Sequence, residues 1–474
     1  MQQDSSIGAL AARLRDDVTG RRPGDRLPSS RALMERHRVS PVTVSRALAL
    51  LAAEGLVVTR PGSGTYVAER RAVAAAEPAD YGWQAVALGG RTIDASGVRA
   101  LLDPPPEGTV ALSGGYLPAA LRPVRALASA LARAARRPDA WEAPPLAGIG
   151  ELRAWFARAV GGDVTPADVL ITSGGQDGLT AALRALSPPS APVLVESPTY
   201  LGALTAIRAA GLHVVPVPFD QDGVRPDLLA DAFAVTGSRV FYCQPTFHNP
   251  TGTVLSAARR EQVLAVARAA GAFVVEDDYA RHLAIDAAPA VPGAGAGAVP
   301  PPLAALDEDG RVVHIASLTK ATAASMRIAA VMARGPVAER IRASLLVNAF
   351  FPARPLQEAA LEVVTAPGWP RHLAAVRTAL RRRRDALLAA VARDLPELGA
   401  TRPAGGLHLW VRLPDGRDDV AVTEAALRAG VLVSAGRPFY PAEPPGPRLR
   451  LTYGAAATEA ELAEGVRRLA RVLV

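Results

Sequence analysis

The sequence predicts an α/β protein in which a small basic module precedes a large domain built on a mainly parallel sheet. Residues 1–71 combine three short helix-like segments with a glycine-rich hairpin, and strand-like and helix-like segments alternate from residue 168 onward. The 474 residues, 49% of them hydrophobic, are enough for two or three domains. No run of 18 or more apolar residues appears and the first residues lack the pattern of a signal peptide, so we expect a cytoplasmic protein with no membrane partner. One cysteine, Cys243, excludes an intrachain disulfide, and we expect no metal site.

Positive charge is concentrated at the N-terminus. Residues 1–71 contain twelve arginines and seven acidic residues, and so hold five units of the net charge of +8. Such an excess is often only a solvated face, so the residue pattern decides whether the module binds nucleic acid. A second run, Arg381–Arg384, follows helical residues and is interpreted as a solvated helix face or a dimer rim.

Three helices and a hairpin are expected in the basic module. Apolar residues recur at helical spacing over 7–18, and the segment 27–31 offers a proline and hydroxyls for the start of a second helix. Ser40 and Pro41 are suited to the N-cap and the first position of a third helix. Two strand-like segments then flank a Pro-Gly-Ser-Gly turn: residues 56–60 and 65–67. This order predicts a winged helix-turn-helix domain.

The module resembles the GntR-type DNA-binding domain over nearly all of residues 7–68. The motifs G-D-R-L-P-S-S-R, V-S-x-x-T-V-x-x-A-L and R-P-G-S-G-T-Y-V carry the resemblance. It implies binding to double-stranded operator DNA, with contacts from three residues: Arg31, Thr43 and Gly64 of the wing. Relatives often have arginine where this chain has Pro41 and Ser45, so Arg46 is an alternative contact, on a base edge, along a phosphate or in solvent.

Composition suggests the limits of the domains. We expect the DNA-binding domain over 1–70, an Ala/Glu/Arg-rich linker over 71–90 and the large domain over 91–474. Within the large domain, a large part is expected to about residue 344 and a small part from about 345 to 474. The Gly/Ala/Pro-rich stretch 287–302 is interpreted as a surface loop insertion.

Polar and aromatic residues follow the predicted strands of the large domain. Ligands of mainly parallel sheets bind at the carboxyl ends of the strands. Residues 172–178, Thr-Ser-Gly-Gly-Gln-Asp-Gly, open a helix, and free N–H groups there favour an anion next to Gly174, Gly175 and Gln176. Further candidates follow other strands: Tyr200, which lies on a cofactor ring or in the core, Asn249, Asp277, Tyr279 and Ser317.

Lys320 is the only lysine of the chain. Arginine supplies positive charge but stays protonated, whereas a Schiff base with an aldehyde requires a primary amine that can lose its proton. Chance survival of one lysine in an arginine-rich composition is the alternative explanation. Ser317 precedes the lysine by three residues and Arg327 follows it by seven, and a hydroxyl with a guanidinium suits a phosphate.

These residues resemble the S-x-x-K…R signature of fold-type I pyridoxal phosphate (PLP) enzymes, and Asn249 opens their N-P-T-G motif. The resemblance implies a homodimer in which PLP forms a Schiff base with Lys320, with a smaller C-terminal α+β part. It also implies the following roles: Ser317 and Arg327 hold the phosphate, Asn249 and Tyr279 donate to the phenolate oxygen, and Asp277 pairs with the pyridine nitrogen.

Two further motifs specify the type of protein. The motif E-D-D-Y, ending at Tyr279, resembles that of MocR-type regulators. These proteins fuse a GntR-type winged helix to an aminotransferase-like domain. In the C-terminal strand-like segment R-L-R-L-T-Y, the resemblance implies that Arg450 grips a substrate or effector carboxylate. Arg448, two residues earlier on the same strand face, is the competing candidate.

The sequence therefore predicts a PLP-dependent transcriptional regulator of the MocR type, which senses an amino compound or PLP through a Schiff base on Lys320. A catalytically active aminotransferase with an accessory DNA-binding head is the alternative, because all residues for the half-reaction are present. A regulator that ignores PLP is a third interpretation, and the intact cofactor set argues against it.

Overall fold

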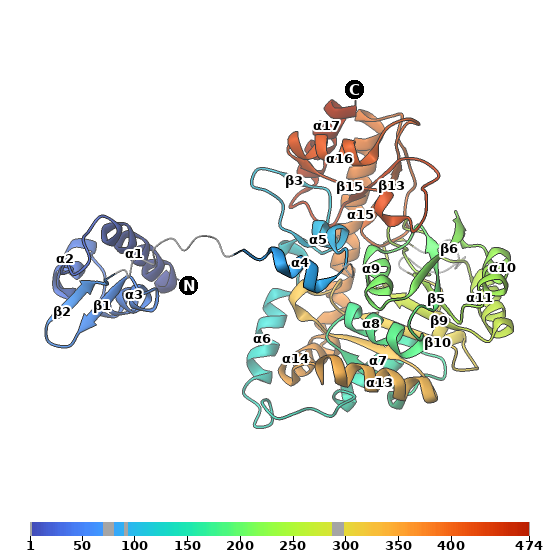
Figure 1. Cartoon of the computed structure of the whole chain (residues 1–474), viewed down its shortest axis with the longest axis horizontal. Helices are drawn as coiled ribbons and strands as arrows, with labels where there is room; N and C mark the ends of the chain where they lie inside the picture. Colours follow the sequence, from blue (N-terminus) through green and yellow to red (C-terminus); the bar gives the residue numbers. More distant parts are fainter. Residues whose placement is uncertain (1, 70–79, 90–92, 287–297, 474) are drawn as a thin grey trace. The chain divides into compact units, whose positions relative to one another are not determined.

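The computed structural model of the chain describes residues 2–69, 80–89, 93–286 and 298–473. The chain divides into two compact units, Met1–Arg91 and Thr92–Val474 (Figure 1). Residues 71–79 and 90 of the expected linker, and 287–297 of the expected insertion, lie outside the described residues. Within the expected linker the structure has a short helix, α4 (Gly82–Leu88). The Asp80 carboxylate accepts the Gly82 N–H at 2.8 Å, which fixes the chain at the start of this helix.

The part of the first unit that precedes α4 is a domain of three helices and a β-hairpin. Its elements are α1 (Gln2–Thr19), α2 (Ser30–His37), α3 (Pro41–Ala53), β1 (Val57–Arg60) and β2 (Gly64–Val67). The hydroxyls of Ser29 and Ser40 accept backbone N–H groups as the N-caps of α2 and α3, and Pro41 takes the first position of α3. The strands pair antiparallel, and apolar residues of all five elements form one core. The predicted winged helix-turn-helix is confirmed.

The second unit is a large α/β structure. Its helices are α5 (Ser96–Leu102), α6 (Val124–Ala134), α7 (Gly150–Val160), α8 (Gly175–Leu186), α9 (Leu201–Ala209), α10 (Pro226–Thr236), α11 (Ala257–Ala270), α12 (Leu303–Leu306), α13 (Pro336–Ala349), α14 (Arg354–Thr365), α15 (Gly368–Asp394), α16 (Asp419–Arg428) and α17 (Glu459–Leu473). Its strands are β3 (Val110–Ala111), β4 (Val169–Thr172), β5 (Pro192–Ser197), β6 (His213–Asp220), β7 (Gly223–Val224), β8 (Val240–Cys243), β9 (Phe273–Asp278), β10 (Val312–Ser317), β11 (Ala329–Met332), β12 (Gly399–Ala400), β13 (His408–Arg412), β14 (Val431–Leu432), β15 (Ser434–Ala435) and β16 (Arg448–Thr452). None of the helices in the described part of the chain has the length and apolar character needed to cross a bilayer.

A central sheet of eight strands in the order β4-β11-β10-β9-β8-β5-β6-β7 organises this unit. Strands β10, β9, β8, β5 and β6 pair in parallel, as the alternation in the sequence predicts. Strand β4 points the same way as β10, because both pair antiparallel with β11. The carboxyl ends of β4, β5, β8, β9 and β10 therefore meet at one edge of the sheet.

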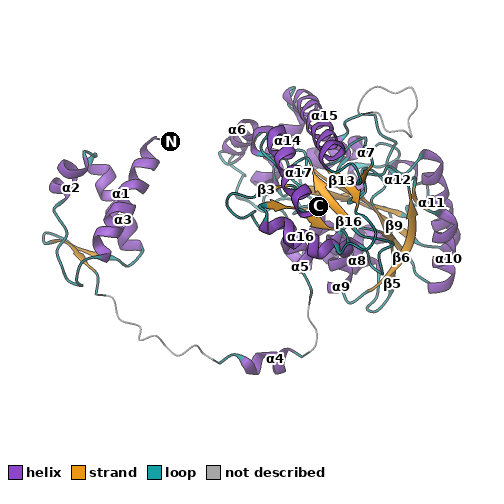
Figure 2. Cartoon of the chain, turned by 90° about the horizontal axis from the view of Figure 1, so that it is seen from above, coloured by secondary structure: helices purple, strands orange, loops and turns teal. Residues whose placement is uncertain are grey.

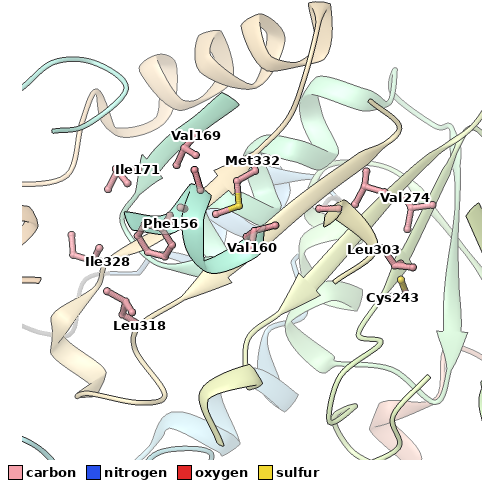
Figure 3. Packing of buried hydrophobic residues seen from close by; sticks show 14 of the residues in the cluster. Phe156, Val160, Val169, Ile171, Cys243, Val274, Leu303, Leu318, Ile328 and Met332 are labelled. Atoms are coloured by element: carbon pink, nitrogen blue, oxygen red, sulfur yellow. The ribbon is translucent and has the colours of Figure 1, made fainter. Parts of the chain in front are cut away.

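Helices cover both faces of the central sheet (Figure 2). One core joins the sheet to α6, α7, α10, α11 and α14, and Figure 3 shows Phe156 and Val160 of α7 packed near Val169, Ile171 and Met332 of the strands. A second core joins the opposite face to α8, α9 and α13. Burial on both faces explains why strands such as β4 are buried at every position.

A smaller sheet, β12-β13-β16-β15, forms the C-terminal part of the unit together with α15, α16 and α17. Strand β3 adds to this part by pairing in parallel with β14, with Val110 opposite Val431. Residues near 110 therefore belong structurally with the C-terminal part, although they precede the central sheet in the sequence.

The second half of the arginine run Arg381–Arg384 is buried, so the predicted solvated helix face is wrong for Arg383 and Arg384. These residues lie on α15, where Arg383 is 4% exposed and Arg384 is 0% exposed. Arg383 donates to the Tyr453 carbonyl at 2.8 Å, and Arg384 donates to the Asp286 carboxylate at 2.6 Å. Backbone and carboxylate oxygens from distant segments thus accept from both guanidinium groups inside the protein, and among the described residues only Arg384 Nη2 has no partner in these two groups.

We predict that Arg383→Ala destabilises the protein by about 3 kcal/mol, because it leaves buried carbonyl oxygens of the 453–457 turn without donors. Arg382→Ala is the matched control, since the Arg382 side chain is 71% exposed, and it should cost less than about 0.5 kcal/mol. Urea denaturation of the two variants measures the difference. Equal effects would contradict a structural role for Arg383.

Candidate functional site

A cavity of about 400 Å³ lies at the carboxyl ends of the central strands and extends to the smaller sheet. The structure brings into its lining ten of the residues predicted from the sequence: Gly175, Gln176, Tyr200, Asn249, Asp277, Tyr279, Ser317, Lys320, Arg327 and Arg450. They come from segments spread over 276 residues of the chain and meet because the strands that precede most of them are parallel.

Lys320 lies three residues beyond the end of β10. Its Nζ donates to the Gly115 carbonyl at 2.7 Å and lies 4.0 Å from the centre of the Tyr116 ring. The pKa of Lys320 is lowered to about 8: burial is the largest cause, Arg450 and Arg327 act in the same direction, and Asp277 opposes them. The neutral, nucleophilic form of this amine is therefore more populated near neutral pH than that of an ordinary lysine.

Asp277 is a buried carboxylate held by two donors. Its Oδ2 accepts from the Tyr242 hydroxyl and from Gln244 Nε2, each at 2.8 Å. Burial raises the pKa of Asp277, and these two hydrogen bonds act in the opposite direction. The Gln244 side chain also accepts the Asn249 N–H through Oε1 at 3.1 Å. The amide group of Gln244 therefore positions both Asp277 and Asn249.

Arg450 is 1% exposed and already has three acceptors. Its guanidinium donates to Asn249 Oδ1 at 3.0 Å, to the Gly114 carbonyl at 3.3 Å and to Ser434 Oγ at 3.4 Å. Burial lowers the pKa of Arg450 to about 10. Arg448 is not among the residues that line the cavity, so the geometry favours Arg450 over its competitor.

One end of the cavity is built for an anion. Gly174 has φ +101° and caps the start of α8, and a Cβ at this position would lie 2.3 Å from Arg327 Nη2. Arg327 reaches this place by donating to the Ser173 carbonyl at 2.8 Å. The free N–H groups at the start of α8, the Ser317 hydroxyl and the Arg327 guanidinium are donors suited to a phosphate.

Tyr200 and Gln176 form a linked pair beside this anion end. The Tyr200 hydroxyl donates to Gln176 Oε1 at 3.3 Å, and Gln176 Nε2 donates to the Gly202 carbonyl at 2.9 Å. A Cβ on Gly202 would lie 2.3 Å from the Tyr200 ring, so glycine is required for this approach. Burial raises the pKa of Tyr200 well above its usual range, which keeps the phenol neutral.

Sequence reasoning missed several residues of this site: Gly115, Tyr116, Tyr242, Gln244 and His408. Tyr242 belongs to a strand that is buried at every position, so its sequence context indicates only a core residue. Its hydrogen bond to Asp277 becomes evident only in the structure. Gly115 and Tyr116 lie in the segment that precedes the central sheet. The glycine pair Gly114-Gly115 is a signal that could have identified it.

The DNA-binding residues predicted in the first unit differ in exposure. Arg31 is exposed and forms an (i, i+4) ion pair with Glu35 at 3.4 Å, and Arg46 is exposed on α3. Thr43 is 7% exposed, and its hydroxyl lies 2.9 Å from Ser40 Oγ. Gly64 begins β2 with φ +121°, and a Cβ there would lie 2.9 Å from Arg26 Nε. Gly64 thus allows the wing to pack on Arg26.

The chain is similar to known proteins over almost its whole length. Residues 110–469 match the aminotransferase class I and II family, and residues 7–67 match the gntR family of bacterial regulatory proteins. The HTH-type transcriptional regulator TauR of Rhodobacter capsulatus is 30% identical, over 98% of this chain and 97% of TauR. The 2-aminoadipate transaminase of Thermus thermophilus is 31% identical, over 82% of this chain and 96% of that protein.

A solved structure has the same fold as the large unit. LysN, the α-aminoadipate aminotransferase of Thermus thermophilus, complexed with N-(5'-phosphopyridoxyl)-L-leucine, gives a TM-score of 0.73 at 30% identity. The similarity covers 80% of this chain and 95% of LysN.

We predict that Gly174→Ala weakens binding of PLP at least about tenfold, because the added methyl group displaces the Arg327 guanidinium from the anion end. Gly237→Ala is the matched control. Gly237 has φ +65° with no atom within 4 Å of an added Cβ, so it carries backbone strain without a clash. Fluorescence titration of the apoprotein with PLP measures both variants, and equal weakening would refute the anion-site assignment.

Proposed function

The chain belongs to the aminotransferase class I and II family and, with its GntR-type winged helix, to the MocR-type regulators, and on this premise we propose that its large unit senses an amino compound or PLP and alters DNA binding. The observation that carries the proposal is the position of the only lysine. Lys320, with a pKa lowered to about 8, shares one cavity with the buried carboxylate of Asp277 and the buried guanidinium of Arg450. The winged helix would bind operator DNA in the cytoplasm, and the resemblance to fold-type I proteins supports a homodimer that presents two winged helices to two half-sites.

The described residues fit PLP. Gly174 leaves open a space that a Cβ would fill, beside donors suited to the phosphate. Asn249 directs Oδ1 to Arg450, so its Nδ2 remains to donate to the phenolate oxygen. Burial of Asp277 favours a cationic partner, which a protonated pyridine nitrogen provides. Tyr279 now donates to the Phe247 carbonyl at 2.8 Å and would turn from it to reach the same phenolate oxygen.

PLP, when bound, supplies an aldehyde carbon that amines attack and a ring that withdraws electrons. The remaining tasks belong to the protein. Lys320 provides the neutral amine to which the cofactor attaches. Asp277, oriented by Tyr242 and Gln244, keeps a proton on the ring nitrogen, and Arg450 binds a carboxylate.

Ligand binding would change contacts that this structure already contains. Lys320 donates to the Gly115 carbonyl and Arg450 to the Gly114 carbonyl, so both cations hold one backbone segment. A carboxylate on Arg450, or attachment of Lys320 to the cofactor, competes with these bonds. Ligands shift a conformational equilibrium only through such differential contacts. The segment continues from β3, which pairs with β14 of the C-terminal part, and this pairing is a route for the change.

Aminotransferase activity is the second candidate function. The same cavity contains residues predicted to hold PLP and a substrate carboxylate, and a relative of 31% identity is named a transaminase. The cavity residues are the same for the two functions, so an experiment has to separate binding from turnover.

We predict that the rate at which the apoprotein captures PLP rises with pH, because only the neutral amine of Lys320 attacks the aldehyde. With a pKa of about 8, the rate should rise most over roughly pH 7 to 9 and then level off, whereas an amine with the ordinary value of 10.5 would continue to gain. Stopped-flow absorbance measures the rate. Lys320→Arg, which keeps the charge without the amine, should yield no borohydride-reducible adduct at any pH, and an adduct in that variant would overturn the assignment.

Operator binding at increasing amino-acid concentration tests the sensing function. The PLP-loaded protein should change its affinity for an operator, selected from random duplexes, by about fivefold or more at saturation. Arg450→Gln should raise the required amino-acid concentration about tenfold or more, because the carboxylate loses a buried charged donor. Arg448→Gln, which changes the neighbouring arginine outside the cavity lining, should not. Steady conversion of amino acids with unchanged operator affinity would instead establish the aminotransferase function.

A further inference from the structure

Three of the charged groups that line the cavity are accounted for by the proposed cofactor. Arg327 belongs to the anion end, Asp277 to the ring nitrogen and Lys320 to the attachment point. Arg450 and His408 lie at the side of the smaller sheet. Of these two, only Arg450 has a role in the proposed function.

His408 is a buried side chain that lines this space and has an unpartnered nitrogen. It begins β13, opposite Thr452 of β16, and the next residue on the same strand face, Trp410, is opposite Arg450. The imidazole and the guanidinium are therefore diagonal neighbours on one face of the smaller sheet. His408 is 3% exposed, and its Nδ1 has no hydrogen-bond partner among the described residues.

The imidazole and the lysine converge on the space above Gly115. A Cβ on Gly115 would lie 3.4 Å from Lys320 Nζ and 4.0 Å from His408 Cε1, the ring atom between the two nitrogens. Glycine at this position keeps the space open. A ligand that reaches Lys320 and Arg450 thus passes the edge of the His408 ring.

The surroundings of His408 favour a neutral ring that donates to an anion. Burial lowers its pKa well below the usual range, and the cations Arg450 and Lys320 lower it further. Such a ring is a poor proton acceptor, which argues against a role as a general base. A neutral imidazole still carries one N–H donor. The neighbouring cations Arg450 and Lys320 attract an anion, so a carboxylate bound to Arg450 is the acceptor that we expect for this donor.

Another group of residues that line the cavity is apolar and forms one wall of it. Val98, Leu101 and Leu102 of α5 line it together with Leu179 of α8. Among the described lining residues, the charged side chains are Asp277, Lys320, Arg327 and Arg450, and all four have roles in the proposed function. A ligand side chain with its own charge would lose water at this wall without gaining a partner.

We propose that the ligand of this cavity is an α-amino acid with an apolar side chain, whose carboxylate is bound jointly by Arg450 and His408. The inference rests on the proposed function, because it assumes that the amino group of the ligand is directed to the cofactor on Lys320. His408 is then a specificity-determining residue for the carboxylate, and α5 determines the preference for the side chain.

Titration of the PLP-loaded protein with matched compounds tests the ligand class. L-leucine is compared with 3-methylbutylamine, which has the same carbon chain without the carboxylate, and with L-glutamate and L-lysine. The absorbance of the bound cofactor and the midpoint of thermal unfolding are the readouts. Half-saturation by leucine should occur at a concentration at least about tenfold below that of the other three. Equal or tighter binding of glutamate or lysine would overturn the proposal.

Substitution of His408 tests its part in the recognition. His408→Phe should weaken leucine about tenfold and leave 3-methylbutylamine within about twofold, because only leucine has the carboxylate. His408→Gln, which restores a donor, should recover part of the loss. His213→Phe, at an exposed position of β6, is the control and should change neither. Equal weakening of both compounds by His408→Phe, or no effect on leucine, would refute the role of His408.

A charge introduced at the apolar wall provides a gain of function. Leu101 is partly buried on α5, and Leu101→Arg should improve glutamate relative to leucine about tenfold by giving the second carboxylate a partner. An unchanged ratio would show that α5 does not meet the ligand side chain. If PLP attaches to Lys320 but neither PLP nor any amino compound alters operator affinity, the proposed sensing function fails as well. If a charged amino acid is the effector, the proposed ligand class is wrong but the proposed sensing function stands.

Discussion

Two buried cations in one cavity, with a single carboxylate beside them, are the constraint on which the site depends. Burial and the Arg450 charge both lower the pKa of Lys320, and Asp277 only partly offsets them, whereas the pKa of Arg450 is lowered by burial. The lysine responds by releasing its proton more easily, to a pKa of about 8. The arginine cannot do so near neutral pH and is held instead by Asn249, Ser434 and a backbone carbonyl. The same excess of positive charge that lowers the pKa of the lysine therefore also favours an anionic ligand in the cavity.

The fold brings this imbalance together from parts that are remote in the sequence. Parallel strands deliver Asp277 and Lys320 from β9 and β10 to neighbouring ends of the sheet, with Ile315 of β10 opposite Asp277. Arg450 comes from the smaller sheet, and the carbonyls that hold both cations come from Gly114 and Gly115, which follow β3. Since β3 pairs with β14 rather than with the central sheet, the cavity has walls from both parts of the unit.

Sequence reasoning predicted the parts of the site that motifs encode and missed those that tertiary structure creates. The N-caps at Ser29 and Ser40, the parallel sheet and the residues around Lys320 follow from local patterns that the structure repeats. Tyr242 and Gln244 were missed because their function depends on a carboxylate from another strand. Arg383 and Arg384 were interpreted as solvated because their acceptors, distant carbonyls and Asp286, are invisible in a helical run of arginines. Helix α4 falls in a segment whose apolar residues are exposed, so it has no buried face that periodicity could reveal.

A regulator and an aminotransferase need the same first event in this cavity, which explains why the residues alone do not separate them. In both, we expect the neutral amine of Lys320 to hold the cofactor and Arg450 to receive a carboxylate. The two functions differ in how they use the free energy of the Lys320 and Arg450 contacts. A regulator must convert the loss of the Lys320 and Arg450 bonds to residues 114 and 115 into a change of conformation, whereas an enzyme would have to return Lys320 to the cofactor at every turnover. Because one short backbone segment accepts from both cations, a ligand that engages both removes two hydrogen bonds from the same place. That concentration of contacts on one segment favours a switch over a site designed only for rapid exchange of substrates.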